Sequence, residues 1–310
     1  MDFYPSAGIN TAQMPGPVND ITLFQCIPAF RPLPLTRLIR SLSCEILLDL
    51  EDSIQEVNDP AGTQKMKAAA RQDCITIFKA FPERKFYLRI NNNDNELKHD
   101  MQLVRNHAAS IKGLFIPKTE TPADIIKVIE KCDTILSLCI ILETLAGIKN
   151  AVEILSEKYT APIPFVFYGN YDFHLNAGIY PVEEQSSSAY WKRVTPLIKL
   201  VEHAEISFGN SPYAHIGDTE SLRAAHKKLM NKCRLPFAMV SLHIDQTRFL
   251  EDLINGSSVA VPNKSISSST ELTSELFLRH KQRGRSFAFD HFRRLITPHE
   301  YQLMLKNSTF

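Results

Sequence analysis

The chain has 310 residues, of which 44% are hydrophobic and 22% charged, a balance typical of a folded protein rather than a disordered one. Its 35 Lys and Arg residues nearly cancel its 34 Asp and Glu residues, so we expect neither a nucleic acid nor an anionic membrane as its main partner. With 11 glycines and no GxGxxG or GxxxxGK[ST] motif, we expect no glycine-rich nucleotide-binding loop.

The first 20 residues are predicted to form an N-terminal extension. They contain no basic region followed by an apolar one, so we expect no secretory signal. The longest apolar runs, such as residues 135–142, have about half the length that a membrane-spanning helix requires. None of the six cysteines forms a CxxC pair, and we expect reduced, mostly buried thiols. These features predict a soluble, cytoplasmic protein.

Eight short apolar runs alternate with amphipathic stretches of helical period over residues 21–254. The runs are apolar on both faces, as is typical of parallel strands covered by helices. Strands are predicted over 22–27, 45–48, 86–90, 113–116, 136–142, 164–168, 204–208 and 238–242, and helices over 35–42, 62–81, 95–111, 122–132, 148–158, 187–202 and 219–232. Thr121 before Pro122, and Asp218 before Thr219, are helix start signals. The repeats favour an α/β fold of the closed (β/α)8 TIM barrel type; an open doubly wound sheet stays as an alternative.

The character of the chain changes after residue 254. Residues 255–270 are rich in serine and contain Gly and Pro, which predicts a flexible loop. Residues 271–310 are predicted to form a C-terminal extension with a helix, a short extended piece over 286–289 and a final helix from Pro298. We expect this extension to act as a lid over the barrel mouth of its own or a neighbouring subunit, or to support oligomerisation.

In such barrels the catalytic groups lie just past the carboxyl ends of the strands. The second predicted strand runs into Asp49, Glu51 and Asp52. Acids packed this closely need a cation, an arginine or backbone N–H groups to offset their repulsion, although acids at a helix start are the alternative interpretation. Lys67 and Arg71, one turn apart on the following helix, are candidates to offset part of this charge.

Two cations lie at the carboxyl ends of the next two predicted strands. Arg89 offers a planar guanidinium that matches a carboxylate ligand, and its alternative role is a structural ion pair with one of the acids after strand two. Lys118 adds a second positive charge at the barrel mouth. We expect it to balance charge rather than to form a Schiff base, because no apolar pocket that would lower its pKa is evident.

Two further carboxylates follow strands five and six. Glu143 closes an apolar strand, and Asp172 follows Gly169, which permits a tight turn. Because adjacent parallel strands lie about 4.8 Å apart, Glu143 and Asp172 can converge on one point. Such oxygen ligands suit Mg2+ or Mn2+; zinc prefers His and Cys, and no HExxH motif is present. A serine hydrolase gains no support, because there is no GxSxG.

The chain resembles the HpcH/HpaI aldolase and citrate lyase β-subunit family, and most closely its citrate lyase β-like branch, over roughly residues 20–250. The resemblance is carried by LLDLEDSI (47–54), KAAAR (67–71), LRIN (88–91), IPKTE (116–120), ILETLAGIKNAVEI (141–154) and FYGNYDF (167–173). It implies a TIM barrel of the phosphoenolpyruvate/pyruvate type that assembles as a homotrimer or hexamer. It also implies Mg2+-assisted cleavage or formation of a carbon–carbon bond next to a carboxylate.

The same resemblance assigns roles by motif position. It implies that Glu143 and Asp172 are the metal ligands, and that Arg89 binds the substrate carboxylate. Glu51 and Asp52 complete the catalytic set by shaping the site and its water. Mg2+ and Arg89 would together neutralise an enolate, so that no covalent intermediate is needed. The expected substrate-binding residues are Arg89, Gly169, Asn170 and Lys118.

The sequence departs from the family pattern at three places. Thr22 stands where the first strand usually has an arginine, Thr297 stands where thioester-using branches often have an aspartate, and the strand-eight motif differs over 237–244. These departures weaken the case for a thioester substrate. The predicted function is therefore a Mg2+-dependent carbon–carbon lyase or aldolase acting on an oxo- or hydroxy-acid. The alternatives are a coenzyme A or acyl-carrier thioester lyase and a non-catalytic ligand-binding barrel.

Overall fold

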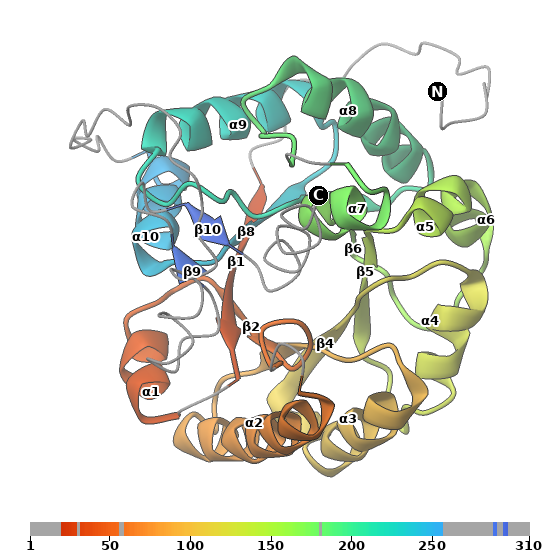
Figure 1. Cartoon of the computed structure of the whole chain (residues 1–310), viewed down its shortest axis with the longest axis vertical. Coiled ribbons are helices and arrows are strands. Elements are labelled where there is room, and N and C mark those ends of the chain that lie inside the picture. Colours follow the sequence, from red (N-terminus) through yellow and green to blue (C-terminus); the bar gives the residue numbers. More distant parts are fainter. Residues whose placement is uncertain are drawn as a thin grey trace.

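The apolar runs form a closed barrel of eight parallel strands, in which each strand pairs with its neighbours in the chain and β8 closes on β1 (Figure 1). The computed structural model describes residues 20–29, 32–55, 59–179, 182–256, 288–289 and 294–296. The barrel strands are β1 (Ile21–Pro28), β2 (Glu45–Asp49), β3 (Phe86–Arg89), β4 (Ile111–Ile116), β5 (Ser137–Leu142), β6 (Phe165–Tyr168), β7 (Ser207–Asn210) and β8 (Phe237–Ser241). The prediction of a (β/α)8 TIM barrel is confirmed.

Helices surround the barrel and cover the outer faces of the strands (Figure 1). Their capping follows the sequence signals, since the Thr121 and Asp124 side chains form a capping box and Asp218 accepts from the N–H of Ser221. The helices are α1 (Pro32–Arg40), α2 (Pro60–Ala80), α3 (Asp94–Asn106), α4 (Pro122–Ile129), α5 (Leu145–Lys149), α6 (Ala151–Ser156), α7 (Asn170–Asn176), α8 (Ser188–His203), α9 (Thr219–Lys232) and α10 (Ile244–Ile254), with a 3-10 turn at Ala108–Ser110.

The structure corrects several element boundaries. The predicted helix over 148–158 is two short helices that meet at Asn150. The sequence analysis missed α7 and α10; α7, with seven residues, is too short to show a helical period. Strand β7 starts three residues later than predicted, because Ala204 caps α8 and Glu205 turns the chain in a left-handed conformation at φ 59°.

Aromatic rings fill the interior of the barrel. The Phe24 ring makes edge-to-face contacts with Tyr87, Phe115, Phe165 and Phe167, at centroid distances of 5.1 to 5.9 Å. Glycines on the neighbouring strands provide the room: a Cβ atom at residue 209 would lie 2.2 Å from the Phe167 ring, and one at residue 113 would lie 2.7 Å from the Tyr87 ring. All six cysteines are free, and four of them are buried, as predicted.

Part of the C-terminal segment lies against the barrel of its own chain. Strands β9 (Ala288–Phe289) and β10 (Leu295–Ile296) pair antiparallel, and the N–H of Leu295 donates to the Ala214 carbonyl at 2.9 Å. The N-terminal extension, most of the serine-rich loop, the predicted helices on either side of β9 and β10, and Thr297 lie outside the described residues. Over the described ranges, no helix has both the length and the apolar character needed to cross a membrane.

Candidate active site

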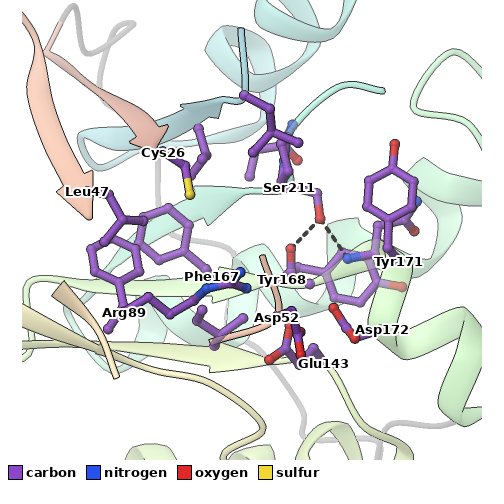
Figure 2. A pocket seen from close by; sticks show the side chains of 18 of the residues that line it. Cys26, Leu47, Asp52, Arg89, Glu143, Phe167, Tyr168, Tyr171, Asp172 and Ser211 are labelled. Atoms are coloured by element: carbon purple, nitrogen blue, oxygen red, sulfur yellow. Dashed lines mark hydrogen bonds between the residues drawn. The ribbon is translucent and has the colours of Figure 1, made fainter. Parts of the chain in front are cut away.

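A cavity of about 100 Å3 lies at the carboxyl ends of the barrel strands, where the sequence analysis expects the site (Figure 2). Acidic, basic and amide side chains line one part of it, and aliphatic and aromatic side chains line the rest. Of the predicted site residues, the cavity is lined by Asp52, Arg89, Glu143, Gly169, Asn170 and Asp172. The two others, Glu51 and Lys118, lie beside it and bond to residues that line it.

Arg89 is held by Asp49, its direct neighbour in the β2–β3 register. The Arg89 Nε and Nη2 atoms donate to the two carboxylate oxygens of Asp49, each at 2.6 Å. The N–H groups of Glu51 and Ser53 donate to the same two oxygens at 2.9 and 3.2 Å. Burial would raise the pKa of Asp49, but the guanidinium lowers it below its usual value. The structural ion pair that the sequence left as an alternative is therefore present, and Asp49 is its acid.

Lys118 neutralises the other two acids that follow β2. Its ammonium group bonds to Glu51 and lies 3.0 Å from each carboxylate oxygen of Asp52. Although burial alone would lower the pKa of Lys118, the neighbouring carboxylates of Asp52 and Glu51 hold it well above its usual range. The lysine stands in a left-handed turn, with φ at 50°, and its N–H donates to Glu143 Oε1 at 2.9 Å. These contacts agree with a charge-balancing lysine.

Lys67 and Arg71 of α2 do not contact these acids, contrary to the sequence-based expectation. Lys67 donates to the side chain of Asn91, and Arg71 pairs with Glu96 and Asp100. Asp100 accepts from the N–H of Asn91 at 2.7 Å. This network therefore ties α2 and α3 to the end of β3 behind the site. Because α2 points these side chains toward α3, the charge after β2 is balanced across the barrel mouth instead.

Glu143 and Asp172 approach each other because of the β5–β6 register. Leu142 is paired with Tyr168, so the next residues, Glu143 and Gly169, lie side by side. A Cβ atom at residue 169 would lie 2.4 Å from Glu143 Oε2, so only glycine fits there. Asp172 is placed by the first turn of α7, which starts directly after this glycine. Figure 2 shows both carboxylates at the same side of the cavity.

The proximity of the two acids has an electrostatic consequence. Glu143 is 2% exposed. Burial raises its pKa well above the usual range, and the negative charge of Asp172 raises it further, despite the opposing effect of Lys118. A buried and a half-buried carboxylate this close therefore favour either a shared proton or a bound cation.

Sequence reasoning missed Ser211, which braces the turn that carries Asn170 and Asp172. Its hydroxyl donates to the Tyr168 carbonyl and accepts from the N–H of Asn170, both at 2.6 Å, so it bridges the two sides of Gly169 (Figure 2). The only signal was a run of polar residues after strand seven. That strand was predicted to end at residue 208, which separated the run from the strand end.

The donor set fits a hard divalent cation. Across the described residues, no group of three or more His, Cys, Asp and Glu side chains is arranged to hold a metal ion. Mg2+, however, is commonly bound by one or two carboxylates, with water and substrate oxygens in its other positions. Glu143 and Asp172 are such a pair, and the repulsion that raises the Glu143 pKa is what a divalent cation relieves.

Residues 26–193, more than half of the chain, match the family described as HpcH/HpaI aldolase/citrate lyase. The chain therefore belongs to this family, as its motifs indicated. Membership confirms the prediction of a carbon–carbon lyase. No curated protein matches the chain.

Solved structures of the same fold include RipC from Yersinia pestis, with 18% sequence identity over 76% of this chain and 95% of that chain, at a TM-score of 0.57. The citrate lyase β subunit of Mycobacterium tuberculosis, complexed with oxaloacetate and magnesium, has 18% identity over 76% of this chain and 97% of its own, at a TM-score of 0.59. CitE from M. tuberculosis, in complex with magnesium, acetoacetate and coenzyme A, has 16% sequence identity. The match covers 95% of this chain and 98% of that chain, at a TM-score of 0.57. At these identities the likeness shows the shared barrel.

Proposed function

We propose that the chain is a Mg2+-dependent carbon–carbon lyase or aldolase that acts on an oxo- or hydroxy-acid. The observation that carries the proposal is the convergence of Glu143 and Asp172 in a cavity that Arg89 also lines. The magnesium and small carboxylate ligands of the M. tuberculosis citrate lyase β subunit support the same assignment. In this proposal Glu143 and Asp172 hold the metal, and Mn2+ can replace Mg2+.

The residues of the chain have distinct tasks in this proposal. When bound, Mg2+ supplies a Lewis acid that stabilises negative charge on the substrate. Arg89 binds the substrate carboxylate through its Nη1 atom, which lies 3.3 Å from Glu51 Oε2, since Asp49 holds the Nε and Nη2 atoms. Because the guanidinium is fixed before substrate arrives, its charge needs no reorganisation as negative charge develops.

Polar groups around the cavity orient the substrate and water. Asp52 lines the cavity and accepts hydrogen bonds from Lys118 at both carboxylate oxygens, so it is placed to accept a proton or position water; Glu51 acts beside it. Asn170 is 2% exposed, and its Oδ1 atom has no hydrogen-bond partner within the described part of the chain. A buried acceptor without a partner is unfavourable, so Asn170 is suited to accept a hydrogen bond from a substrate hydroxyl. Gly169 leaves the space that the Glu143 carboxylate occupies.

The test measures proton exchange at the methyl group of pyruvate in deuterated water, followed by NMR. Formation of an enolate exchanges these protons, so the native chain should catalyse exchange with Mg2+ and not without it. Glu143→Gln should reduce the rate about 100-fold or more, because it removes a metal ligand. Glu153→Gln, a matched change of an exposed acid on α6, should have no effect. Absence of exchange, or exchange that depends on neither Mg2+ nor Glu143, would overturn the proposal.

The proposal also includes the assembly and location that the family resemblance implies. We expect a homotrimer or hexamer in the cytoplasm, with a small carboxylic acid as substrate. Light scattering after size-exclusion chromatography measures the subunit number directly. A monomer at micromolar concentration would contradict the expected assembly.

A further inference from the structure

The cavity is divided into a charged part and an apolar part. Figure 2 shows the Glu143 and Asp172 carboxylates on one side of the Arg89 head group, and Leu47 and Phe167 on the other. Val240, at the end of β8, and Leu242, just after it, continue the apolar lining. Both side chains are only partly buried, so they leave apolar surface open toward the cavity.

The positive charge on the described residues that line the cavity suits a substrate with a single carboxylate. Arg89 is the only positively charged side chain among the described residues that line the cavity, and it already contacts both Asp49 and Glu51. Lys118 lies nearby, but its ammonium group bonds to two acids. A second carboxylate on the substrate would lie against aliphatic and aromatic groups. Burying a charge without a cation is strongly unfavourable, so the apolar part disfavours a dicarboxylic substrate.

Leu295 belongs to the apolar part of the cavity lining. It lines the cavity although it lies over 50 residues beyond β8, and it is 1% exposed. It packs in one cluster with Tyr171, Val182 and Ala214, against which Leu242 also packs. The adjacent Arg294 forms a backbone bridge with residue 215, and its Nε atom lies 3.5 Å from a carboxylate oxygen of residue 184. The C-terminal segment of the same chain thus supplies an apolar wall to the site.

We propose that the substrate is a monocarboxylic oxo- or hydroxy-acid with a short branched aliphatic substituent, which packs against Val240 and Leu242 under Leu295. The inference deepens the proposed function, because the substrate's carboxylate and oxygen occupy the charged part of the same site. The whole cavity measures about 100 Å3, less than the roughly 150 Å3 apolar cavity that can hold a benzene molecule, so beside the charged groups it has room for only a short branched group.

The test compares the binding of three 2-oxo acids by isothermal titration in the presence of Mg2+. The probes are pyruvate, 4-methyl-2-oxopentanoate, and 2-oxoglutarate, which has a carboxymethyl group where the branched acid has an isopropyl group. Each buried methylene group strengthens binding roughly fourfold, so the branched acid should bind about tenfold or more tightly than pyruvate. It should exceed 2-oxoglutarate by at least as much, because that ligand buries an unpaired charge.

Variants locate the apolar contacts. Val240→Thr keeps the shape of the side chain and adds a hydroxyl group, and Leu295→Ala shortens the wall. Each should weaken binding of the branched acid roughly fivefold while changing that of pyruvate less than about twofold. Ile135→Ala, a truncation of a side chain that is 80% exposed on the surface, should change neither.

The outcomes separate the two proposals. Equal or tighter binding of 2-oxoglutarate, or a branched-acid preference that survives both variants, would overturn the substrate assignment. If pyruvate still binds in a Mg2+-dependent manner in that case, the proposed function stands. If none of the three acids binds with Mg2+ present, both proposals fail.

Discussion

Replacing Asp49 by asparagine is expected to destabilise the folded chain by about 4 kcal/mol. Each oxygen of the Asp49 carboxylate accepts one N–H from Arg89 and one from the backbone. In asparagine an NH2 group replaces one of the two oxygens and cannot accept a hydrogen bond. The Arg89 N–H and the backbone N–H that donated to this oxygen therefore both lose their acceptor. A buried donor without a partner costs about 1–3 kcal/mol, and breaking a buried ion pair costs about 3–5 kcal/mol. Because Asp49 is 0% exposed, water cannot compensate for the loss.

Urea unfolding followed by circular dichroism measures this loss, and a double-mutant cycle assigns it. Asp49→Asn, Arg89→Met and the double variant should show a coupling energy of about 2 kcal/mol or more, because removing both partners leaves no unpaired charge. Asp133→Asn, the same change at an exposed position, is the control and should change the unfolding free energy by less than about 0.5 kcal/mol. Additive effects, or an Asp49→Asn loss below about 1 kcal/mol, would refute the reasoning.

Three further predictions follow from single positions. Ser211→Ala should cost about 2 kcal/mol in unfolding experiments, since both backbone groups that the hydroxyl bridges lose their partner; an unchanged stability would contradict this. Gly169→Ala should weaken Mg2+ binding about tenfold or more in calorimetric titrations, because its methyl group displaces Glu143, whereas Gly217→Ala adds a methyl in open space and should not. Burial lowers the pKa of His226, so the folded state binds a proton less readily than the unfolded state. The free energy of unfolding should therefore fall as the pH drops below about 6.5, the usual pKa of histidine. His226→Gln should reduce that fall in urea unfolding at pH 7.5 and 5.5, and equal pH dependence in both proteins would show that this histidine makes no contribution.

The sequence predicts helices and strands correctly where the residues within the element itself decide its structure. All eight strands were recognised, because a strand buried between helices and a barrel interior is apolar on both faces. Helix α9 was predicted at its observed bounds from its capping aspartate and its helical period. Helix α7 was missed because its seven residues form too few turns to show a period, and α10 was missed although its 11 residues span about three turns.

Apolar pattern and motif order run along the chain, so the barrel, the acids and arginine at its carboxyl end, and the family were all predictable from the residues alone. The pairing of the charged side chains, in contrast, depends on how distant segments pack against one another. Strand register set Asp49 against Arg89, while the left-handed turn at Lys118, rather than a cation from α2, brought positive charge to the acids after β2. Folding also placed Ser211 and Leu295 at a cavity whose other walls lie far away in sequence. Contacts between distant segments depend on register, side-chain direction and packing, and none of these is written in local composition.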